Sequence, residues 1–337
     1  MKPLIGIVNS SSFGRLFPDH LQRIGAFAKV ERVNIPASTE IPTLIRELSD
    51  FHGIIVSVTP RFTSEVLQEL TKLVVICRHG IGFDNIDIKT ATRLGICVSR
   101  VPGVVEQQAV AEHTLLLMLA ACRQLVQARE AVIKGNWGNR AQFIGIELRD
   151  QKIGLIGLGN VGRRVAEMLK NGFGGEVVAF DPFLTDTHFQ HAGVKRVSYE
   201  ELLTSCSVIS LHCSLNETSY HCIGEKEFSM MQKGVILVNT SRGELIDEKA
   251  LEDALKRGFV GAYASDVTEN MPAASDHPLL KYPNVVVLPH LGSYTLQSLK
   301  GMGDTMVQDL ENVFVHNSFP HNLVDREVMQ TGLRSWS

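Results

Sequence analysis

Two short segments of the chain carry side chains suited to handling a small organic acid. Val238-Asn239-Thr240-Ser241-Arg242-Gly243 places an arginine just beyond an expected strand, and Leu288-Pro289-His290-Leu291-Gly292 places a histidine beyond another. A guanidinium can pair with a carboxylate or keto acid, and an imidazole exchanges a proton near neutral pH. Taken singly, Arg242 is as well explained by a salt bridge and His290 by a capped loop. Their shared position at strand exits, where ligands bind in open α/β sheets, favours a chemical role.

A glycine-rich turn follows the strand expected at Lys152–Ile156. Its GxGxxG pattern precedes a helical pattern of apolar residues, which is the context that a dinucleotide requires. The first glycine permits the tight turn, the second lets the backbone approach a pyrophosphate, and the third allows close helix–strand packing. The free N–H groups of a helix start favour phosphates. The expected contact residues are Gly157, Gly159, Asn160, Val161 and Gly162.

An acidic residue ends the next expected strand. Asp181 closes Val177-Val178-Ala179-Phe180-Asp181, nineteen positions after Gly162. A carboxylate there can accept hydrogen bonds from ribose hydroxyls and repels a 2′-phosphate, which favours NAD over NADP. The alternative is an ordinary βαβ turn with a surface aspartate.

These residues need parallel sheets to position them, and the rest of the chain predicts two. Short β-branched runs alternate with helical patterns, which indicates α/β architecture. The alternation of strands and helices is interrupted by a long helical stretch from Glu106 to about Lys134. A further helix is expected from Gln297 to about Val315. The expected strands are Leu4–Val8, Gly53–Val58, Leu73–Cys77, Ile96–Ser99, Lys152–Gly157, Glu176–Asp181, Ser207–Leu211, Gly234–Asn239, Gly261–Asp266 and Asn284–Leu288.

Composition sets the broad class of the protein. A chain of 337 residues with 44% hydrophobic and 20% charged residues suits a folded protein with two domains. The net charge of -3 gives no basic surface for nucleic acid, and no apolar run is long enough for a membrane span. Six scattered cysteines without CxxC spacing indicate buried free thiols, so we expect a cytoplasmic protein without a metal site.

The ordered set of motifs resembles the D-isomer-specific 2-hydroxyacid dehydrogenases, the group that contains D-3-phosphoglycerate, D-lactate, glyoxylate/hydroxypyruvate and formate dehydrogenases. The resemblance spans roughly Leu4 to Val324. The segments that carry it are Gly80–Asp87, Ala109–His113, Gly157–Gly162, Leu211–Leu215 with Thr218, Asn239–Asp247, Ala264–Val267 and Pro289–Ser293.

The resemblance implies two flavodoxin/Rossmann-like, doubly wound parallel-sheet domains with a cleft between them. Residues 1–102 and 293–330 would form the substrate domain, and residues 103–292 the NAD-binding domain. Family members dimerise through a helix and arm that match residues 106–140, so a homodimer is expected. The physics of the fold does not choose the substrate.

The resemblance also implies a role for each matched position. Arg242 would hold the substrate carboxylate and polarise the carbonyl, and His290 would be the general acid or base. Backbone N–H groups around His79 and Gly80 would bind the carboxylate. Apart from the resemblance, Arg78 flanks the expected mouth of the site and would bind a distal anionic group of the substrate or pair with a surface acid. The expected cofactor contacts beyond the glycine turn are Asp181, His212, Ser214, Thr240, Ser241, Asp266 and Gly292.

The chain departs from the family pattern at one catalytic position. The family has a Glu directly before the proline of D-V-x-x-x-E-P, where this chain has Met271. A thioether cannot hold the second imidazole nitrogen, so we expect His290 to titrate lower and carbonyl reduction to weaken above about pH 6.5. Glu269 could substitute for the missing carboxylate, or it could be an ordinary solvated loop residue.

The sequence therefore predicts an NAD-dependent oxidoreductase that moves a hydride between nicotinamide and a small D-2-hydroxy or 2-keto acid. The alternative is a catalytically weakened NAD(H)-sensing protein of the same fold, which the substitution at Met271 favours. Retention of both Arg242 and His290 favours the enzyme.

Overall fold

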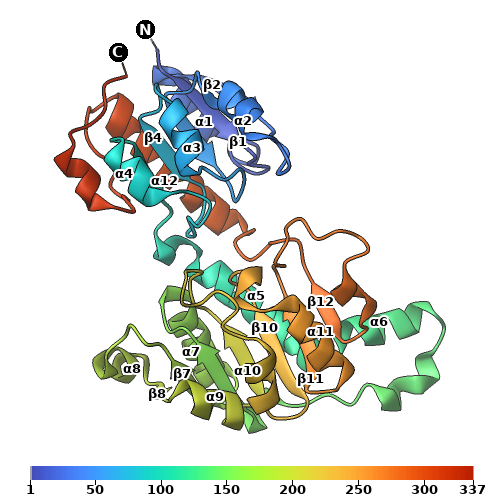
Figure 1. Ribbon diagram of the computed structural model, residues 1–337. Helices are drawn as coiled ribbons and strands as arrows, with labels where there is room; N and C mark the ends of the chain where they lie inside the picture. The colour runs from blue at the N-terminus through green and yellow to red at the C-terminus, as the bar shows by residue number, and fades with distance from the viewer. Residues whose placement is uncertain (1, 337) are drawn as a thin grey trace. The chain divides into compact units, whose positions relative to one another are not determined.

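The computed structural model describes residues 2–336 and divides into two compact units, each drawn in Figure 1. The first unit runs through Glu106 and resumes at Tyr294, and the second is Gln107–Ser293. The second unit is therefore inserted into the first. The change of unit falls inside a helix, between Glu106 and Gln107.

The first unit is built on a five-stranded parallel sheet with the order β2-β1-β3-β4-β5. This is the order of a flavodoxin-like doubly wound fold. Its strands are β1 (Leu4–Val8), β2 (Lys29–Val33), β3 (Gly53–Val56), β4 (Val75–Arg78) and β5 (Cys97–Arg100). Its helices are α1 (Pro18–Phe27), α2 (Ile41–Leu48), α3 (Ser64–Glu69), α4 (Ile88–Arg93) and α12 (Leu296–Phe314), with the 3-10 turn η5 (Arg326–Gln330).

Helices cover both faces of this sheet. Side chains of α1 and α12 pack with β1 residues such as Ile5 and Ile7 on one face. Side chains of α2, α3 and α4 pack with alternate strand residues such as Val8 and Ile54 on the other. Because neighbouring residues of a strand point to opposite faces, strands buried on both sides are almost continuously apolar.

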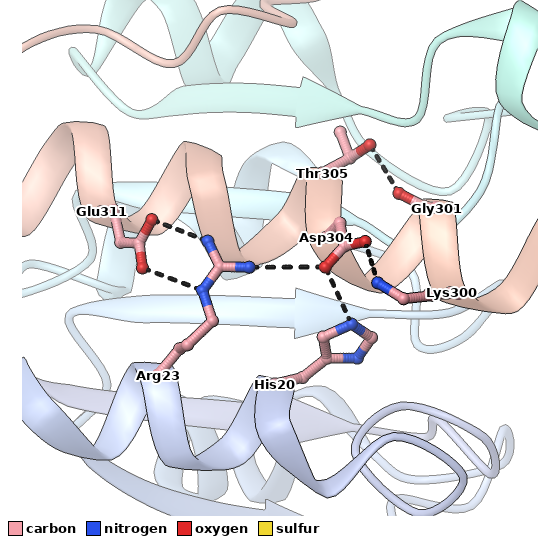
Figure 2. A network of polar contacts seen from close by, with 7 residues as sticks. All are labelled: His20, Arg23, Lys300, Gly301, Asp304, Thr305 and Glu311. Carbon is pink, nitrogen blue, oxygen red and sulfur yellow. Dashed lines mark hydrogen bonds and ion pairs between the residues drawn. The ribbon is translucent and has the colours of Figure 1, made fainter.

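A polar network joins α1 to α12 at the edge of the first core (Figure 2). The Arg23 guanidinium binds Glu311 at 2.9 Å and Asp304 at 3.4 Å, and His20 Nε2 lies 3.3 Å from Asp304. His20 is 1% exposed, and its ring stacks on Phe13. The ring also lies against the backbone of Gly303, where an added Cβ would collide with it.

The same network contains a cluster of possible metal-ligating atoms. Ligand atoms of Asp19, His20 and Asp304 lie within 4.8 Å of one another. Lys300 Nζ lies 2.7 Å from Asp304, and Arg23 also contacts that carboxylate, so two cationic side chains already balance its charge. The cluster is therefore explained as part of the packing between α1 and α12.

The second unit is built on a seven-stranded parallel sheet with the order β12-β11-β10-β9-β6-β7-β8. Its strands are β6 (Lys152–Ile156), β7 (Glu176–Phe180), β8 (Lys195–Arg196), β9 (Val208–Leu211), β10 (Val235–Asn239), β11 (Val260–Ser265) and β12 (Val285–Val287). Its helices are α5 (Gly103–Cys122, shared with the first unit), α6 (Leu125–Ile133), α7 (Asn160–Gly172), α8 (Asp186–Ala192), α9 (Tyr199–Ser205), α10 (Glu225–Met230) and α11 (Glu248–Lys256), with 3-10 turns η1 (Trp137–Gln142), η2 (Leu148–Asp150), η3 (Gly243–Leu245) and η4 (Pro278–Lys281). The prediction of two doubly wound parallel-sheet domains is confirmed.

Helices again cover both faces of this larger sheet. Residues of α5, α7 and α8 form one core, and residues of α9, α10 and α11 form the other. The α11 boundaries follow local sequence, because the Asp247 carboxylate accepts the N–H groups of Lys249 and Ala250, and Gly258 adopts a positive φ of 70° just past the helix end.

In the second unit, the carboxyl ends of β7, β6, β9, β10, β11 and β12 form one row at the same edge of the sheet. Register pairs Phe180 with Ile156, Ile156 with Leu211, Leu211 with Asn239, Asn239 with Ser265, and Ser265 with Val287. The chain leaves β6 toward one side of the sheet and β9 toward the other, so the switch point lies between these two strands. Ligands bind at such a point in open α/β sheets. The next residues along the chain are Asp181, Gly157, His212, Thr240, Asp266 and Leu288.

The long helix expected from Glu106 to Lys134 is instead two helices. Gln124 has a left-handed φ of 50°, and α5 and α6 are bent by 60° at this break. Within residues 2–336 no single helix is long and apolar enough to cross a membrane; α5 and α6 reach that apolar length only as a bent pair. α6 has no buried residue, whereas α5 lies in the core.

Gly303→Ala is expected to lower the free energy of unfolding of the first unit, by about 1–3 kcal/mol for an overpacked core. The new Cβ would displace the buried His20 ring and its bond to Asp304. Gly25→Ala in α1 is the matched control, because nothing lies within 4 Å of its added Cβ. The control should stabilise by about 0.5–1 kcal/mol. Urea unfolding of both variants measures the difference, and equal midpoints would contradict the packing described here.

Candidate active site

The glycine turn after β6 is shaped by its neighbours. Gly157 has a φ of 95°, and a Cβ there would lie 2.7 Å from the backbone nitrogen of Cys213. A Cβ at Gly162 would collide with the carbonyl oxygen of Gly157. The turn after β6 therefore packs directly against the chain that leaves β9. Only glycine at positions 157 and 162 allows this close packing.

The residues around this turn fit a dinucleotide. α7 begins immediately after Gly159 without a side-chain cap, and nothing lies within 4 Å of a Cβ added at Gly159. N–H groups of that first turn can therefore face a pyrophosphate. Beside the turn, neither ring nitrogen of His212 has a hydrogen-bond partner within the described residues, and both nitrogens are buried. Burial lowers the pKa of His212 to about 4, so the ring is neutral and can both donate and accept.

The carboxylate of Asp181 is fixed beside the same turn. Its Oδ2 accepts the N–H of Leu158 at 2.9 Å, and its Oδ1 accepts the N–H of Phe183 at 3.0 Å. Each carboxylate oxygen can accept a second hydrogen bond. The structure thus fixes the Asp181 carboxylate beside the glycine turn, with a further acceptor site on each oxygen.

The loop after β10 fixes the backbone of Arg242. Asn239 accepts the N–H of Ser241 at 3.0 Å and donates its amide to the carbonyl of Arg242 at 2.8 Å. The Arg242 guanidinium donates to the Ser241 carbonyl at 2.8 Å. Asn239 is fully buried at the strand end, so its side-chain hydrogen bonds hold the loop backbone in place from within the sheet.

A close backbone contact places this loop against the chain that leaves β11. A Cβ added at Gly243 would overlap the carbonyl carbon and oxygen of Thr268 and the nitrogen of Glu269. Glycine is therefore required directly after Arg242, because any larger residue would push the two loops apart.

The loop that carries His290 is held by Asp266, the first residue after β11. The Asp266 carboxylate is buried, with Oδ1 accepting the N–H of Leu291 and Oδ2 accepting the N–H of Gly292, both at 2.7 Å. The backbone N–H of His290 donates to the Asp266 carbonyl at 3.0 Å, and His113 Nε2 lies 3.3 Å from Oδ1. His290 has a φ of 56°, a left-handed conformation that such contacts must hold in place.

The other expected cofactor residues differ in how their side chains are used. Thr240 Oγ1 shares a hydrogen bond of 2.8 Å with Thr114, and Ser241 Oγ donates to the Leu211 carbonyl at 2.9 Å. Ser214 is exposed. The Thr240 and Ser241 hydroxyls are therefore bonded to neighbouring segments at the strand ends.

The structure gives Glu269 a partner that the sequence did not suggest. Its Oε1 lies 2.9 Å from Nε2 of His221, and its backbone N–H donates to Glu248 at 3.0 Å. His221 lies in an irregular loop without a motif, so no local signal marked it. Met271, in the family Glu position, is half-buried on the loop that carries Glu269.

The substrate-binding residues expected in the first unit lie at the end of β4 and directly after it. Arg78 is 4% exposed and donates from Nη1 to the His79 carbonyl at 2.5 Å. The N–H of His79 donates to Val56 and that of Gly80 to Arg78, both at 2.8 Å. These two amides are both hydrogen-bonded within the chain. Burial, with the nearby Arg78 and His20, lowers the pKa of His79 to about 3, so this ring stays neutral.

Asp266→Asn tests whether this carboxylate fixes the His290 loop. An amide offers one acceptor oxygen, so one of the two N–H groups would face an NH₂ donor. A buried donor without a partner costs about 1–3 kcal/mol. Hydrogen exchange at Leu291 and Gly292 should accelerate, while exchange in the Gly157–Gly162 turn stays unchanged. Unaltered exchange at both amides would rule out this role.

Comparison with known proteins agrees with this geometry. Residues 115–292 match the family described as "D-isomer specific 2-hydroxyacid dehydrogenase, NAD binding domain", so the second unit is an NAD-binding domain. The chain is 41% identical over 270 residues to a D-3-phosphoglycerate dehydrogenase of Archaeoglobus fulgidus, a match that covers 80% of this chain and 51% of that protein. The match thus spans about half of that relative's length.

Two further relatives match over nearly their whole length. A glyoxylate reductase of Thermococcus litoralis is 33% identical, with 98% of each chain covered. A crystal structure of D-lactate dehydrogenase from Aquifex aeolicus, complexed with NAD and lactic acid, superposes with a TM-score of 0.83 at 27% identity and covers 95% of this chain and 98% of its own. The protein therefore belongs to the D-isomer-specific 2-hydroxyacid dehydrogenase family.

Proposed function

We propose that the protein is an NAD-dependent oxidoreductase that interconverts a small D-2-hydroxy acid and its 2-keto acid. The proposal rests on one observation. Arg242 and His290 each follow a strand end of the same row, Asn239 of β10 and Val287 of β12, and these strands flank β11. The backbones that bear both side chains contact the segment immediately after β11. This arrangement supports joint action on one substrate beside the nucleotide turn.

The roles proposed for the two side chains follow from their chemistry. Arg242 would pair with the substrate carboxylate and stabilise the negative charge that develops on the carbonyl oxygen. His290 would give a proton to that oxygen during reduction and take it back during oxidation. NAD, when bound, supplies the hydride acceptor or donor. Asp181 and the uncapped first turn of α7 would hold the adenosine ribose and the pyrophosphate.

The first unit is proposed to supply the remaining substrate contacts, from the segment after β4. Because the amides of His79 and Gly80 are already bonded, we assign the carboxylate contact to the amides that follow, at Ile81 and Gly82. The buried guanidinium of Arg78 is the candidate for a distal anionic group. The relatives include both a phosphoglycerate dehydrogenase and glyoxylate reductases, so the substrate class is a short 2-keto acid with or without such a group.

We also propose that the protein forms a homodimer through residues 106–140. None of the residues of α6 is buried. Large apolar side chains in and beyond this arm are exposed, including Leu125 at 55%, Ile133 at 66% and Trp137 at 73%. Several exposed large apolar side chains on one segment favour a protein interface there.

The direct test is NADH oxidation with glyoxylate, hydroxypyruvate, pyruvate and phosphohydroxypyruvate. His290→Ala should lower kcat at least about 100-fold, the usual contribution of a general acid, while NADH binding is retained. His316→Ala, at an exposed position after α12, is the control and should leave turnover unchanged. Tight NADH binding by the native protein without turnover of any acid would support the alternative, an NAD-sensing protein.

The second test concerns the missing family carboxylate. The family pattern implies a carboxylate next to the imidazole at this position, so Met271→Glu should raise the pKa of the His290 imidazolium and keep the proton-donating form to higher pH. The alkaline limb of kcat/KM for keto-acid reduction should therefore move upward. Met271→Gln, similar in size but neutral, should not move it. A pH profile that is the same for Glu and Met at this position would refute the proposed electrostatic role.

A further inference from the structure

The connection between the neighbouring parallel strands β11 and β12 contains a loop, residues 269–277, that we call the Met271 loop. From Asn270 to Asp276 its residues are exposed or half-buried. Every hydrogen bond that these residues make within the described part of the chain is to Thr268 or His277, at 3.0 Å in both cases. The middle of the loop is therefore held only through its two ends.

One carboxylate contacts both of those ends. Glu248 is the first residue of α11, and its side chain is 13% exposed. Its Oε1 accepts the N–H of Glu269 at 3.0 Å, and its Oε2 lies 3.1 Å from Nε2 of His277. A single side chain thus closes the Met271 loop at its base.

The contact with Glu248 also fixes the hydrogen of the His277 ring. An ionised carboxylate can only accept a hydrogen bond, so the Nε2 nitrogen must carry the hydrogen. The Nδ1 nitrogen is buried and has no hydrogen-bond partner within residues 2–336. A hydrogen moved from Nε2 to Nδ1 would therefore lose the bond to Glu248 and gain none in return. The ring, in a side chain that is 11% exposed, is a fixed donor to Glu248.

Two further contacts place the base of the loop against its neighbours. A Cβ added at Gly243 would overlap the backbone nitrogen of Glu269. One turn further along α11, the Glu252 carboxylate accepts the Tyr282 hydroxyl at 3.1 Å. Successive turns of α11 therefore hold the connection between β11 and β12, and the Glu248 carboxylate is the group that reaches both ends of the Met271 loop.

The position of this loop bears on the proposed reaction. The loop begins three residues after Asp266, whose carboxylate holds the His290 loop, and its first residue abuts the backbone directly after Arg242. It carries Met271 at the position where the family pattern implies a group next to the imidazole. A displacement of about 1 Å at a distant support can cost on the order of 100-fold in rate, so the base of this loop must be fixed.

We propose that Glu248 is a positioning residue for the oxidoreductase reaction. It contacts neither substrate nor cofactor, and it acts by binding both ends of the Met271 loop, with His277 as its side-chain partner. This holds residue 271 at a fixed place relative to the loops of Arg242 and His290. The catalytic consequence rests on the proposed function, whereas the hold of Glu248 on the loop does not.

The first test measures the loop itself by amide hydrogen exchange. Glu248→Ala removes the acceptor at both ends, so exchange at Glu269 and through the rest of the loop should accelerate at least about 10-fold, while exchange in α7 stays unchanged. Asp253→Asn is the matched control, because it neutralises a carboxylate of the same helix whose side chain is 74% exposed. Its exchange should equal that of the native chain.

A pair of variants at His277 separates the hydrogen bond from packing and leaves α11 unaltered. Glutamine has an amide that can donate to Glu248 from nearly the same place as Nε2, whereas leucine of similar size has no donor. His277→Gln should therefore keep the native exchange of the loop. His277→Leu should accelerate exchange at the far end of the loop, at Asp276 and His277. Circular dichroism checks that each variant is folded.

The second test compares keto-acid reduction with NADH binding in the same variants. Glu248→Ala and His277→Leu should lower kcat about 10-fold with NADH affinity unchanged, and His277→Gln and Asp253→Asn should keep the native kcat. Native loop exchange in Glu248→Ala would overturn the proposal, and so would faster exchange with an unchanged kcat. Failure of the proposed function is distinct, because the native chain would then bind NADH and turn over no acid. In that case Glu248 positions no reaction.

Discussion

The buried carboxylate of Asp266 is the interaction on which the arrangement of this site depends. It follows β11, the strand between the two that lead to Arg242 and His290. Both its oxygens accept backbone N–H groups of the His290 loop. A buried charge is tolerated when it is fully hydrogen-bonded, and here the bonding partners are the loop that must be placed. The same segment, two residues later, abuts Gly243 and so fixes the loop of Arg242.

Placing both loops from one central segment has a functional consequence. A guanidinium and an imidazole far apart in sequence can act together only if their loops share a rigid support. The aligned strand ends give each loop the same starting point, and the Asp266 bonds hold His290 in a left-handed conformation. The placement of the two loops relative to each other comes from backbone contacts at the sheet edge.

The sequence was informative where function depends on local pattern. The strand–GxGxxG–helix order and the acidic residue ending the next strand located the glycine turn, where Gly157 and Gly162 are required by close backbone contacts and Gly159 faces open space. Edge strands were harder to predict from the sequence. β2, at Lys29–Val33, alternates charged and apolar residues and is half-exposed, so it lacks the apolar run of a buried strand.

Features that arise only from tertiary contact could not be read from the sequence. Nothing marks Gln124 as the residue that breaks the long helix, since left-handed conformations usually call for glycine or asparagine. The pairing of Glu269 with His221 joins positions 48 residues apart. The closing segment had no expected element, yet Arg334 donates to Leu73 and Trp336 packs edge-on against Phe314.

A crystal structure of the protein with NADH and oxamate, an unreactive analogue of a 2-keto acid, would test the joint action of Arg242 and His290 most directly. We expect the Arg242 guanidinium and the His290 ring both to lie within hydrogen-bond distance of oxamate, with the Asp266 carboxylate still accepting the amides of Leu291 and Gly292. A complex in which either side chain is directed away from oxamate, or in which Asp266 has left the loop, would contradict it.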